Sequence, residues 1–196
     1  HWVAFHKEKQ MYKALKELDK ESQFSPQKQL IEFSSESNDT VILADNRESK
    51  SQVLKELTNQ GFKVKTENLD IGDYIISDKI VIERKTPADF INSILDKRIF
   101  SQIKNLRENY PKPLVIIEGE EDIFSIRKIH PNAILGVLTT ITLGYHVPIL
   151  FTKNSIETTN LIKVIVNKER ENKRVESLEE KLNNCLAKLS SIPFIQ

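Results

Sequence analysis

Short apolar runs and amphipathic segments alternate along the chain from Val41 onward. Residues 41–44 and 114–117 are entirely apolar, which is typical of strands that are buried on both faces of a sheet. Residues 51–60 instead carry apolar side chains at helical spacing and are followed by Gly61, a residue that commonly ends a helix. The pattern therefore predicts strands and helices in alternation.

The middle of the chain predicts a β-hairpin. Two apolar stretches, Tyr74–Ile76 and Ile80–Ile82, are separated by Ser77-Asp78-Lys79, a polar turn segment. Further expected elements are a strand over 62–69, helices that open at Thr86-Pro87, near Phe100 and at Pro131, a strand over 147–151, and a long helix capped by Ser155. Together they predict an α/β fold with a mixed central sheet that helices largely cover.

One long stretch carries no charge. Between Lys128 and Lys153 there is no Asp, Glu, Lys or Arg, and a segment of this length could cross a bilayer. Several threonines, His146 and Pro148 interrupt its apolar character. We therefore interpret it as a buried helix followed by a buried strand and expect no membrane span.

Three regions are expected along the chain. Residues 1–40 predict a charged helical tail followed by a linker rich in Ser, Gln, Asn and Glu, a composition that buries little apolar surface. Residues 41–172 hold the alternating elements and form the expected main domain, and residues 173–196 predict a C-terminal helix or linker. Because the first residue is His1, we expect the chain to be a piece of a longer protein.

Composition narrows the function only slightly. Lys and Arg number 29 against 28 Asp and Glu, so the net charge gives no support of its own for nucleic-acid binding. The single cysteine, Cys185, excludes an internal disulfide and a cysteine-based zinc site, and it suits a reducing, intracellular setting. With five glycines and no Walker motif, binding of a nucleoside triphosphate is not expected.

The candidate chemistry lies at Asp73, Glu83 and Lys85. Alternation along a strand points Glu83 and Lys85 to one face and Arg84 to the other. If Ser77-Asp78-Lys79 is a three-residue turn, Asp73 lies across from Glu83, and a two-residue turn would make the two residues diagonal neighbours.

Two carboxylates this close repel each other unless a cation or a proton lies between them. Mg²⁺ suits such a pair, because it binds one or two carboxylates together with waters and substrate phosphate. A lysine beside the metal would orient or help deprotonate an attacking water, and the metal would stabilise charge on the reacting phosphate. The alternative is a solvated cross-strand ion pair, worth less than about 1 kcal/mol. The apolar neighbours Tyr74–Ile76 and Ile80–Ile82 favour the functional interpretation, because unpaired carboxylates that emerge from a buried region are costly.

Several motifs resemble those of the XPF/Hef family of structure-specific endonucleases. Gly72-Asp73-Tyr74, Glu83-Arg84-Lys85 and Asp89 match its GD…ERK…D signature, a variant of the restriction-enzyme PD-(D/E)xK core. Asp45-Asn46-Arg47-Glu48 is similar to the family's D-x-R-E element, and residues 126–134 to its IRxxHPNAI segment. Order and spacing agree from about Val41 to Lys168, so the resemblance covers the whole predicted domain. It implies a restriction-endonuclease-like fold and metal-dependent cleavage of DNA.

The resemblance also implies roles for single residues. Asp73, Glu83 and Asp45 would bind the metal, directly or for Asp45 from its second shell, and the backbone carbonyl of Arg84 would complete the ligand set. Lys85 would activate or position water, and Asp89 would support the site. Arg47 would clamp the scissile phosphate, and Arg127 and Lys128 would contact the DNA backbone. Mg²⁺ is the expected metal, and Mn²⁺ accepts the same ligands.

Each of these residues also has a structural interpretation. Asp45 could cap the turn that follows it, and Asp89 could complete a capping box with Thr86. Arg47 could belong to an exposed ion pair with Glu48, and Arg127 and Lys128 resemble any exposed basic pair. Tyr74 is expected in the core rather than in contact with DNA.

The resemblance finally implies partners. Fork or 3′-flap DNA would be the substrate, in DNA repair or replication-fork processing, and a tandem helix-hairpin-helix domain would follow residue 196. The helices near 131–143 and 155–168 carry more apolar residues than one covered face needs. We expect them to form a homodimer, as the corresponding region does in the family. For an archaeal protein the setting would be the cytoplasm, near the nucleoid. The alternative function is a non-catalytic DNA-binding or dimerisation scaffold of the same fold.

Overall fold

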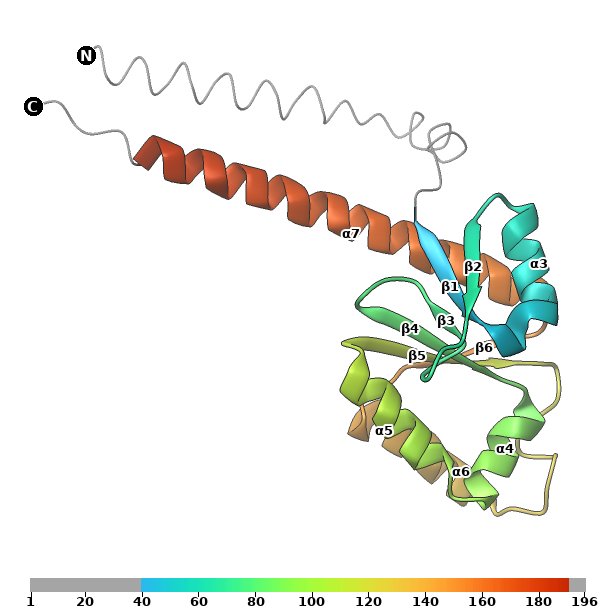
Figure 1. Ribbon diagram of the computed structural model, residues 1–196. Coiled ribbons are helices and arrows are strands. Elements are labelled where there is room, and N and C mark those ends of the chain that lie inside the picture. Colours follow the sequence, from blue (N-terminus) through green and yellow to red (C-terminus); the bar gives the residue numbers. More distant parts are fainter. Residues whose placement is uncertain (1–39, 191–196) are drawn as a thin grey trace, which may run out of the picture. The chain divides into compact units, whose positions relative to one another are not determined.

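The computed structural model describes residues 40–190, so the predictions for residues 1–39 and 191–196 lie outside the described residues. The described part falls into two units. The first ends at Glu169 and contains the sheet, and the second holds the C-terminal part of the last helix from Arg170. The sheet and all predicted site residues lie in the first unit (Figure 1).

Six strands form one mixed sheet. They are β1 (Val41–Asp45), β2 (Lys63–Glu67), β3 (Tyr74–Ile75), β4 (Ile80–Lys85), β5 (Lys112–Glu118) and β6 (Ile149–Thr152). Their order across the sheet is β2-β1-β3-β4-β5-β6. Strand β3 runs antiparallel to both of its neighbours, and the other neighbouring pairs are parallel. The predicted mixed sheet is therefore confirmed.

The helical segments are η1 (Asn46–Lys50), α3 (Gln52–Asn59), α4 (Pro87–Leu95), α5 (Ile99–Asn109), α6 (Pro131–Thr139), the π-helical turn η2 (Thr140–Gly144) and α7 (Ser155–Ser190). Helices α3, α4, α5 and α6 begin where the sequence predicts, whereas η1 was not predicted. The predicted Ser155 cap of α7 is wrong, because Asn154 caps this helix by accepting from the N–H groups of Ile156 and Glu157. The Ser51 hydroxyl caps α3 by accepting from the N–H of Leu54. The Thr86 hydroxyl caps α4 by accepting from the N–H of Asp89, just before Pro87 occupies the first helical position.

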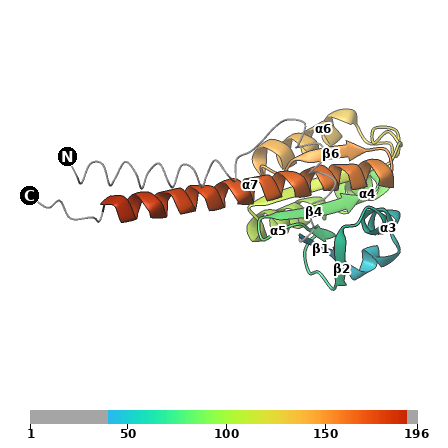
Figure 2. The same cartoon turned by 90° about the horizontal axis from the view of Figure 1, so that it is seen from above.

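Different helices cover the two faces of the sheet (Figures 1 and 2). Helix α3 and the first half of α7 cover one face, with a core that includes Ile82 and Ile116; we call it the α7 face. Helices α4, α5 and α6 cover the other, with a core that includes Val81 and Ile117; we call it the α5 face. Because side chains alternate along a strand, odd-numbered residues of β4 and β5 point to the α5 face and even-numbered residues to the α7 face.

The charge-free stretch is more exposed than its sequence predicts. Helix α6 and turn η2 bury Ile134 and Ile141, yet Leu135 is 49% exposed and Leu143 68%. Strand β6 leaves Phe151 57% exposed. The prediction of a buried helix and a buried strand is therefore wrong for the single chain, because α6 has one covered side and β6 lies at an edge of the sheet. In the described part of the chain, no helix combines the length and the apolar character that a membrane span requires.

The two edge strands of the described sheet differ in chemistry. Strand β2 exposes Lys63 and Lys65, and Lys65 forms an ion pair with Glu67. Strand β6 instead exposes the apolar side chains of Leu150 and Phe151. Charged residues on an edge strand oppose pairing with another strand, whereas an apolar edge does not.

Candidate active site

Gly72 sets the path of the backbone into the site. It has a φ of +78°, and a Cβ atom there would lie 2.3 Å from Cγ2 of Val81, so only glycine fits. The backbone N–H of Asp73 donates to the carbonyl oxygen of Ile82 at 2.8 Å, and the carbonyl oxygen of Asp73 accepts from the N–H of Asp45 at 2.9 Å. Asp73 is thereby fixed between β1 and β4.

Asp73, Glu83 and Lys85 meet on the α5 face. The hairpin pairs Tyr74 with Ile82. Of the two turn lengths that the sequence allows, the structure therefore has the three-residue turn, which places Asp73 across from Glu83. Oδ2 of Asp73 accepts from the backbone N–H of Arg84 at 2.7 Å. Nζ of Lys85 lies 2.8 Å from Oε1 of Glu83, with the two side chains only 10% and 15% exposed.

The charges in this cluster are not balanced. The pKa of Asp73 is raised to about 7, first because the carboxyl group is buried and second because the negative charge of Glu83 is close. The N–H of Arg84 and the positive charge of Lys85 act in the opposite direction but do not compensate. A divalent cation between the two carboxylates would remove the repulsion that raises this pKa. The chemistry of the donor set therefore fits a metal ion.

The residues that could hold a metal are two carboxylates rather than three. Within residues 40–190 no group of three or more His, Cys, Asp or Glu side chains is arranged to bind a metal ion. Mg²⁺ is commonly held by one or two carboxylates together with waters and substrate phosphate, so Asp73 and Glu83 are sufficient. The predicted metal roles of Asp73, Glu83, Asp45 and the Arg84 carbonyl remain predictions.

Asp45 holds Arg47 in the structure. Its carboxylate accepts from the N–H of Arg47 at 2.8 Å, from Nε of Arg47 at 2.7 Å and from the N–H of Leu69 at 2.9 Å. The side-chain hydrogen bond from Arg47 is the largest cause that lowers the pKa of Asp45 to about 2. The Arg47 side chain is 75% exposed, and the charges of Asp73 and Glu83 help to raise its pKa. Asp45 thus presents an exposed guanidinium group close to the carboxylate cluster.

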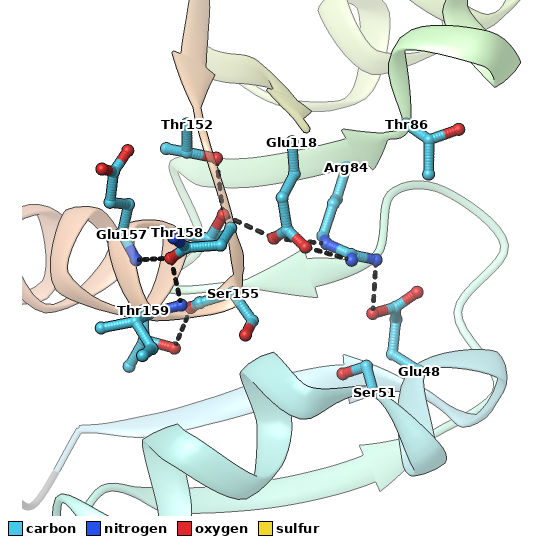
Figure 3. A network of polar contacts seen from close by, with 12 residues as sticks. Glu48, Ser51, Arg84, Thr86, Glu118, Thr152, Ser155, Glu157, Thr158 and Thr159 are labelled. Carbon is cyan, nitrogen blue, oxygen red and sulfur yellow. Dashed lines mark hydrogen bonds and ion pairs between the residues drawn. The ribbon is translucent and has the colours of Figure 1, made fainter. Parts of the chain in front are cut away.

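The Arg84 side chain points to the opposite face (Figure 3). Its Nε and Nη2 donate to the two carboxylate oxygens of Glu118 at 2.9 and 2.6 Å, and Nη1 donates to Glu48 at 3.4 Å. Oε2 of Glu48 also accepts from the hydroxyl of Tyr74 at 2.7 Å. Only the backbone of Arg84 therefore reaches the Asp73 cluster.

The remaining predicted residues lie outside this cluster. Thr86 donates through its hydroxyl to the Asp89 carboxylate, and the backbone N–H of Asp89 donates to that hydroxyl, so Asp89 takes part in the exposed cap of α4 without the backbone bond of a capping box. Arg127 and Lys128 are exposed in the segment between β5 and α6. Their predicted contacts with the site and with DNA remain predictions.

Sequence reasoning missed Thr152 and Thr158, the two threonines of the polar network on the α7 face. The hydroxyl of Thr158, in α7, donates to Glu118 at 2.5 Å. Glu118 has a signal in the sequence, because it is the charged residue that ends the apolar run of β5. Thr158 has none, because its partner lies 40 residues away in the sequence.

Comparisons with known proteins agree with this architecture. The model of the ERCC4 domain matches residues 44–165. A Methanocaldococcus jannaschii protein named as an ATP-dependent RNA helicase is 43% identical over 129 residues, 66% of this chain and 16% of that protein. The 3′-flap repair endonuclease Xpf of Saccharolobus solfataricus is 37% identical over 161 residues, 79% of this chain and 66% of that protein. The structure of XPF from Aeropyrum pernix in complex with DNA superposes with a TM-score of 0.61 at 28% identity, covering 67% of this chain and 66% of that one.

The sheet, its helical layers and the carboxylate pair at the end of the β3–β4 hairpin define a restriction-endonuclease-like α/β domain. The chain belongs to the ERCC4-domain family, since the family model matches more than half of its length. The family and the fold that the XPF/Hef resemblance predicts are therefore confirmed. The chain spans only 16% and 66% of the two curated relatives described above.

Proposed function

We propose that this chain is the nuclease domain of a metal-dependent, structure-specific endonuclease that hydrolyses phosphodiester bonds in branched DNA. The observation that carries the proposal is the partly buried cluster of Asp73, Glu83 and Lys85, in which two neighbouring carboxylates share a single ammonium group. The name of the S. solfataricus relative and the DNA bound to the A. pernix protein support DNA as the substrate class. Forks or 3′ flaps met in DNA repair and replication are the branched structures that we propose.

In the proposed mechanism, Asp73 and Glu83 would hold Mg²⁺ (or Mn²⁺), and the backbone carbonyl of Arg84 would be a further ligand. The bound ion would lower the pKa of a water molecule and stabilise the charge on the reacting phosphate. The chain's own residues orient the reactants. Lys85, held at 2.8 Å from Glu83, provides an ammonium group that positions the attacking water, and Arg47 binds the scissile phosphate in the orientation that Asp45 gives it.

DNA contacts outside the centre are proposed for Arg127 and Lys128. Both side chains are exposed, so each can form an ion pair with a phosphate without first losing a partner inside the fold. Such contacts position DNA without reading its sequence, as expected for an enzyme that selects DNA by shape.

The first experiment compares wild type with Asp73→Asn and Lys85→Ala on labelled fork, 3′-flap, duplex and single-stranded DNA. Each reaction is run at low salt with Mg²⁺, with Mn²⁺ and with EDTA, because phosphate contacts weaken steeply as salt rises. Glu108→Gln is the control, because this glutamate is exposed on α5 and forms an ion pair with the exposed Lys104. We expect metal-dependent cleavage near the branch by wild type and the control, and a loss on the order of a hundredfold or more in both site variants. Folded wild type that binds forks without cutting them would instead favour the scaffold function.

We also propose a homodimer through α6, η2, β6 and the first half of α7. Exposed apolar residues concentrate there, namely Leu135, Leu143, Leu150, Phe151, Ile156 and Val164. Ile156 and Val164 are eight residues apart and so lie on one side of α7. A surface of this kind, beside an apolar edge strand, is typical of a protein interface.

Light scattering tests the dimer directly. Wild type should have twice the chain mass of 22.7 kDa, and Phe151→Asp should be a monomer, because burying an unpaired charge in an interface is strongly unfavourable. Leu95→Asp is the matched control: Leu95 is 52% exposed, similar to Phe151 at 57%, but lies on α4. A monomeric wild type would contradict the proposal.

A further inference from the structure

Arg84 is held by a polar network that joins three parts of the fold on the α7 face (Figure 3). Its guanidinium group makes two hydrogen bonds to Glu118 at the end of β5 and one to Glu48 in η1. The side chains of Arg84, Glu118 and Glu48 are only 20%, 10% and 16% exposed. A bidentate ion pair of this kind fixes the orientation of a guanidinium group as well as its position.

Helix α7 and strand β6 complete the network through two threonines. The Thr158 hydroxyl donates its only proton to Oε2 of Glu118 at 2.5 Å. In its 2.7 Å contact with Thr152 it must therefore accept, so the order of donation runs from Thr152 to Thr158 to Glu118. Burial raises the pKa of Glu118, but the hydrogen bonds from Arg84 and Thr158 outweigh that effect and hold the pKa below its usual range. Both oxygens of Glu118 thus have donors, and this carboxylate is stable as an anion.

Arg84 makes hydrogen bonds on both faces of the sheet. The Arg84 side chain is fixed on the α7 face, while its backbone N–H donates to Oδ2 of Asp73 on the α5 face at 2.7 Å. The orientation of that N–H depends on where the end of β4 lies, and the bonds to Glu118 fix the end of β4 against β5. Strand β3 is only two residues long. The backbone bond from Asp73 to Ile82 holds the main chain of Asp73 beside β4, and the N–H of Arg84 is the donor that orients its carboxylate.

We propose that Glu118 and Thr158 are positioning residues of the nuclease centre: through Arg84, they hold the Asp73 carboxylate in the orientation needed for the reaction. Neither residue touches the carboxylate cluster itself. The proposal rests on the proposed function only where it concerns catalysis. The part that concerns the Arg84 N–H and Asp73 holds whatever reaction the cluster performs.

The chain offers a closely matched set of variants. Thr158→Val keeps the shape of the side chain but removes the hydroxyl that donates to Glu118, and Thr158→Ser restores that hydroxyl. The control is Thr159→Val, because Thr159 is equally buried on the same helix but its hydroxyl donates only to the carbonyl oxygen of Ser155 in the contacts drawn in Figure 3. Glu118→Gln is a second, independent change that keeps the size of the side chain and removes one acceptor oxygen.

Two measurements on the full chain test the proposal. The first is the hydrogen-exchange rate of the Arg84 backbone amide, followed by NMR. We expect it to rise roughly tenfold in Thr158→Val and in Glu118→Gln, relative to the amides of buried β5, and to return to the wild-type rate in Thr158→Ser. The second is cleavage of fork DNA in Mg²⁺: kcat should fall about tenfold in the same two variants while KM changes less than about twofold, since DNA contacts lie elsewhere. Thermal melting checks that each variant is folded.

The outcomes separate this proposal from the nuclease proposal. Wild-type exchange of the Arg84 amide in both Thr158→Val and Glu118→Gln would overturn it. An equal effect of Thr159→Val would also overturn it, because the cause would then be a general loosening of α7. If wild type cuts no DNA, the nuclease proposal fails, and the amide exchange still decides whether Glu118 and Thr158 position Asp73.

Discussion

Two carboxylates near the end of β4 lie in opposite environments, one on each face of the sheet. Glu118, on the α7 face, accepts hydrogen bonds from Arg84 and Thr158, and its pKa is lowered. Asp73, on the α5 face, accepts one backbone N–H and lies near the negative charge of Glu83, and its pKa is raised to about 7. Burial raises the pKa of both groups and is the largest cause for each. Only Glu118 has enough hydrogen-bond donors and positive charge beside it to outweigh that effect.

This contrast separates structural from functional polar residues. A buried carboxylate with donors on both oxygens is stable as it is and holds strands together. One that is crowded by a second negative charge is unstable without a further cation, and such groups are typical of functional sites. In this molecule the two kinds are separated by the alternation of side chains along β4, with Arg84 on one face and Glu83 and Lys85 on the other.

Removing the cation of the structural network should have the largest effect on stability. Arg84→Met keeps the aliphatic length of the side chain but leaves Glu118 and Glu48 without their shared positive charge. We expect the free energy of unfolding in urea to fall by about 3 kcal/mol or more, as for other partly broken buried ion pairs. Arg98→Met is the control, because Arg98 and Asp96 are both 57% exposed, and its change should stay below about 1 kcal/mol. If Arg84→Met and Arg98→Met lowered the free energy of unfolding equally, the buried network around Arg84 would stabilise the fold no more than an exposed ion pair does.

Removing a charge from the functional cluster should stabilise the protein. The folded-state pKa of Asp73 is raised from 3.8 to about 7, so its ionisation disfavours the folded state, and stability is lost as the pH rises from about 4 through 7. Asp73→Asn cannot ionise. At pH 8 without metal we expect this variant to be more stable than wild type by on the order of 2 kcal/mol, and the difference should disappear below pH 4. Glu118→Gln should have the opposite sign at pH 8. A destabilised Asp73→Asn would show that Asp73 is structural.

Asp45 offers the smallest and most specific test. It lies at the end of β1 near the functional cluster, but its carboxylate accepts four N–H hydrogen bonds, three from Arg47 and one from Leu69. Its folded-state pKa is lowered from 3.8 to about 2, so its stabilisation is present above pH 4 and is lost as the pH falls toward 2. Wild type should exceed Asp45→Asn in stability by on the order of 1 kcal/mol at pH 6, and the gap should shrink between pH 4 and pH 2. A gap independent of pH would mean that the charge of Asp45 contributes nothing.

The sequence was sufficient for the local geometry of the centre. The polar turn Ser77–Lys79 and the period of two along a strand predict that Asp73, Glu83 and Lys85 share a face, with Arg84 on the other. Position-specific motifs then identify the family and its fold. Tyr74 was expected in the core, and it is fully buried, although its hydroxyl also bonds to Glu48 and Ser51.

What the sequence could not predict depends on contacts between distant segments. Thr158 meets Glu118 only because α7 returns across the sheet, and no local pattern marks a threonine in a helix for that role. The charge-free stretch was predicted to be buried because its composition is apolar. An apolar composition indicates that these side chains should be shielded from water. It does not say whether the same chain or another molecule shields them.

The unlike edges of the sheet also limit how the protein can assemble. Strand β2 presents Lys63 and Lys65, whereas β6 presents Leu150 and Phe151. Two chains that associate on the β6 side would cover both apolar edges and leave only lysine-bearing edges outward. Association of that kind would stop at a closed pair with twofold symmetry, so the proposed dimer would use the apolar edge without forming open-ended fibres.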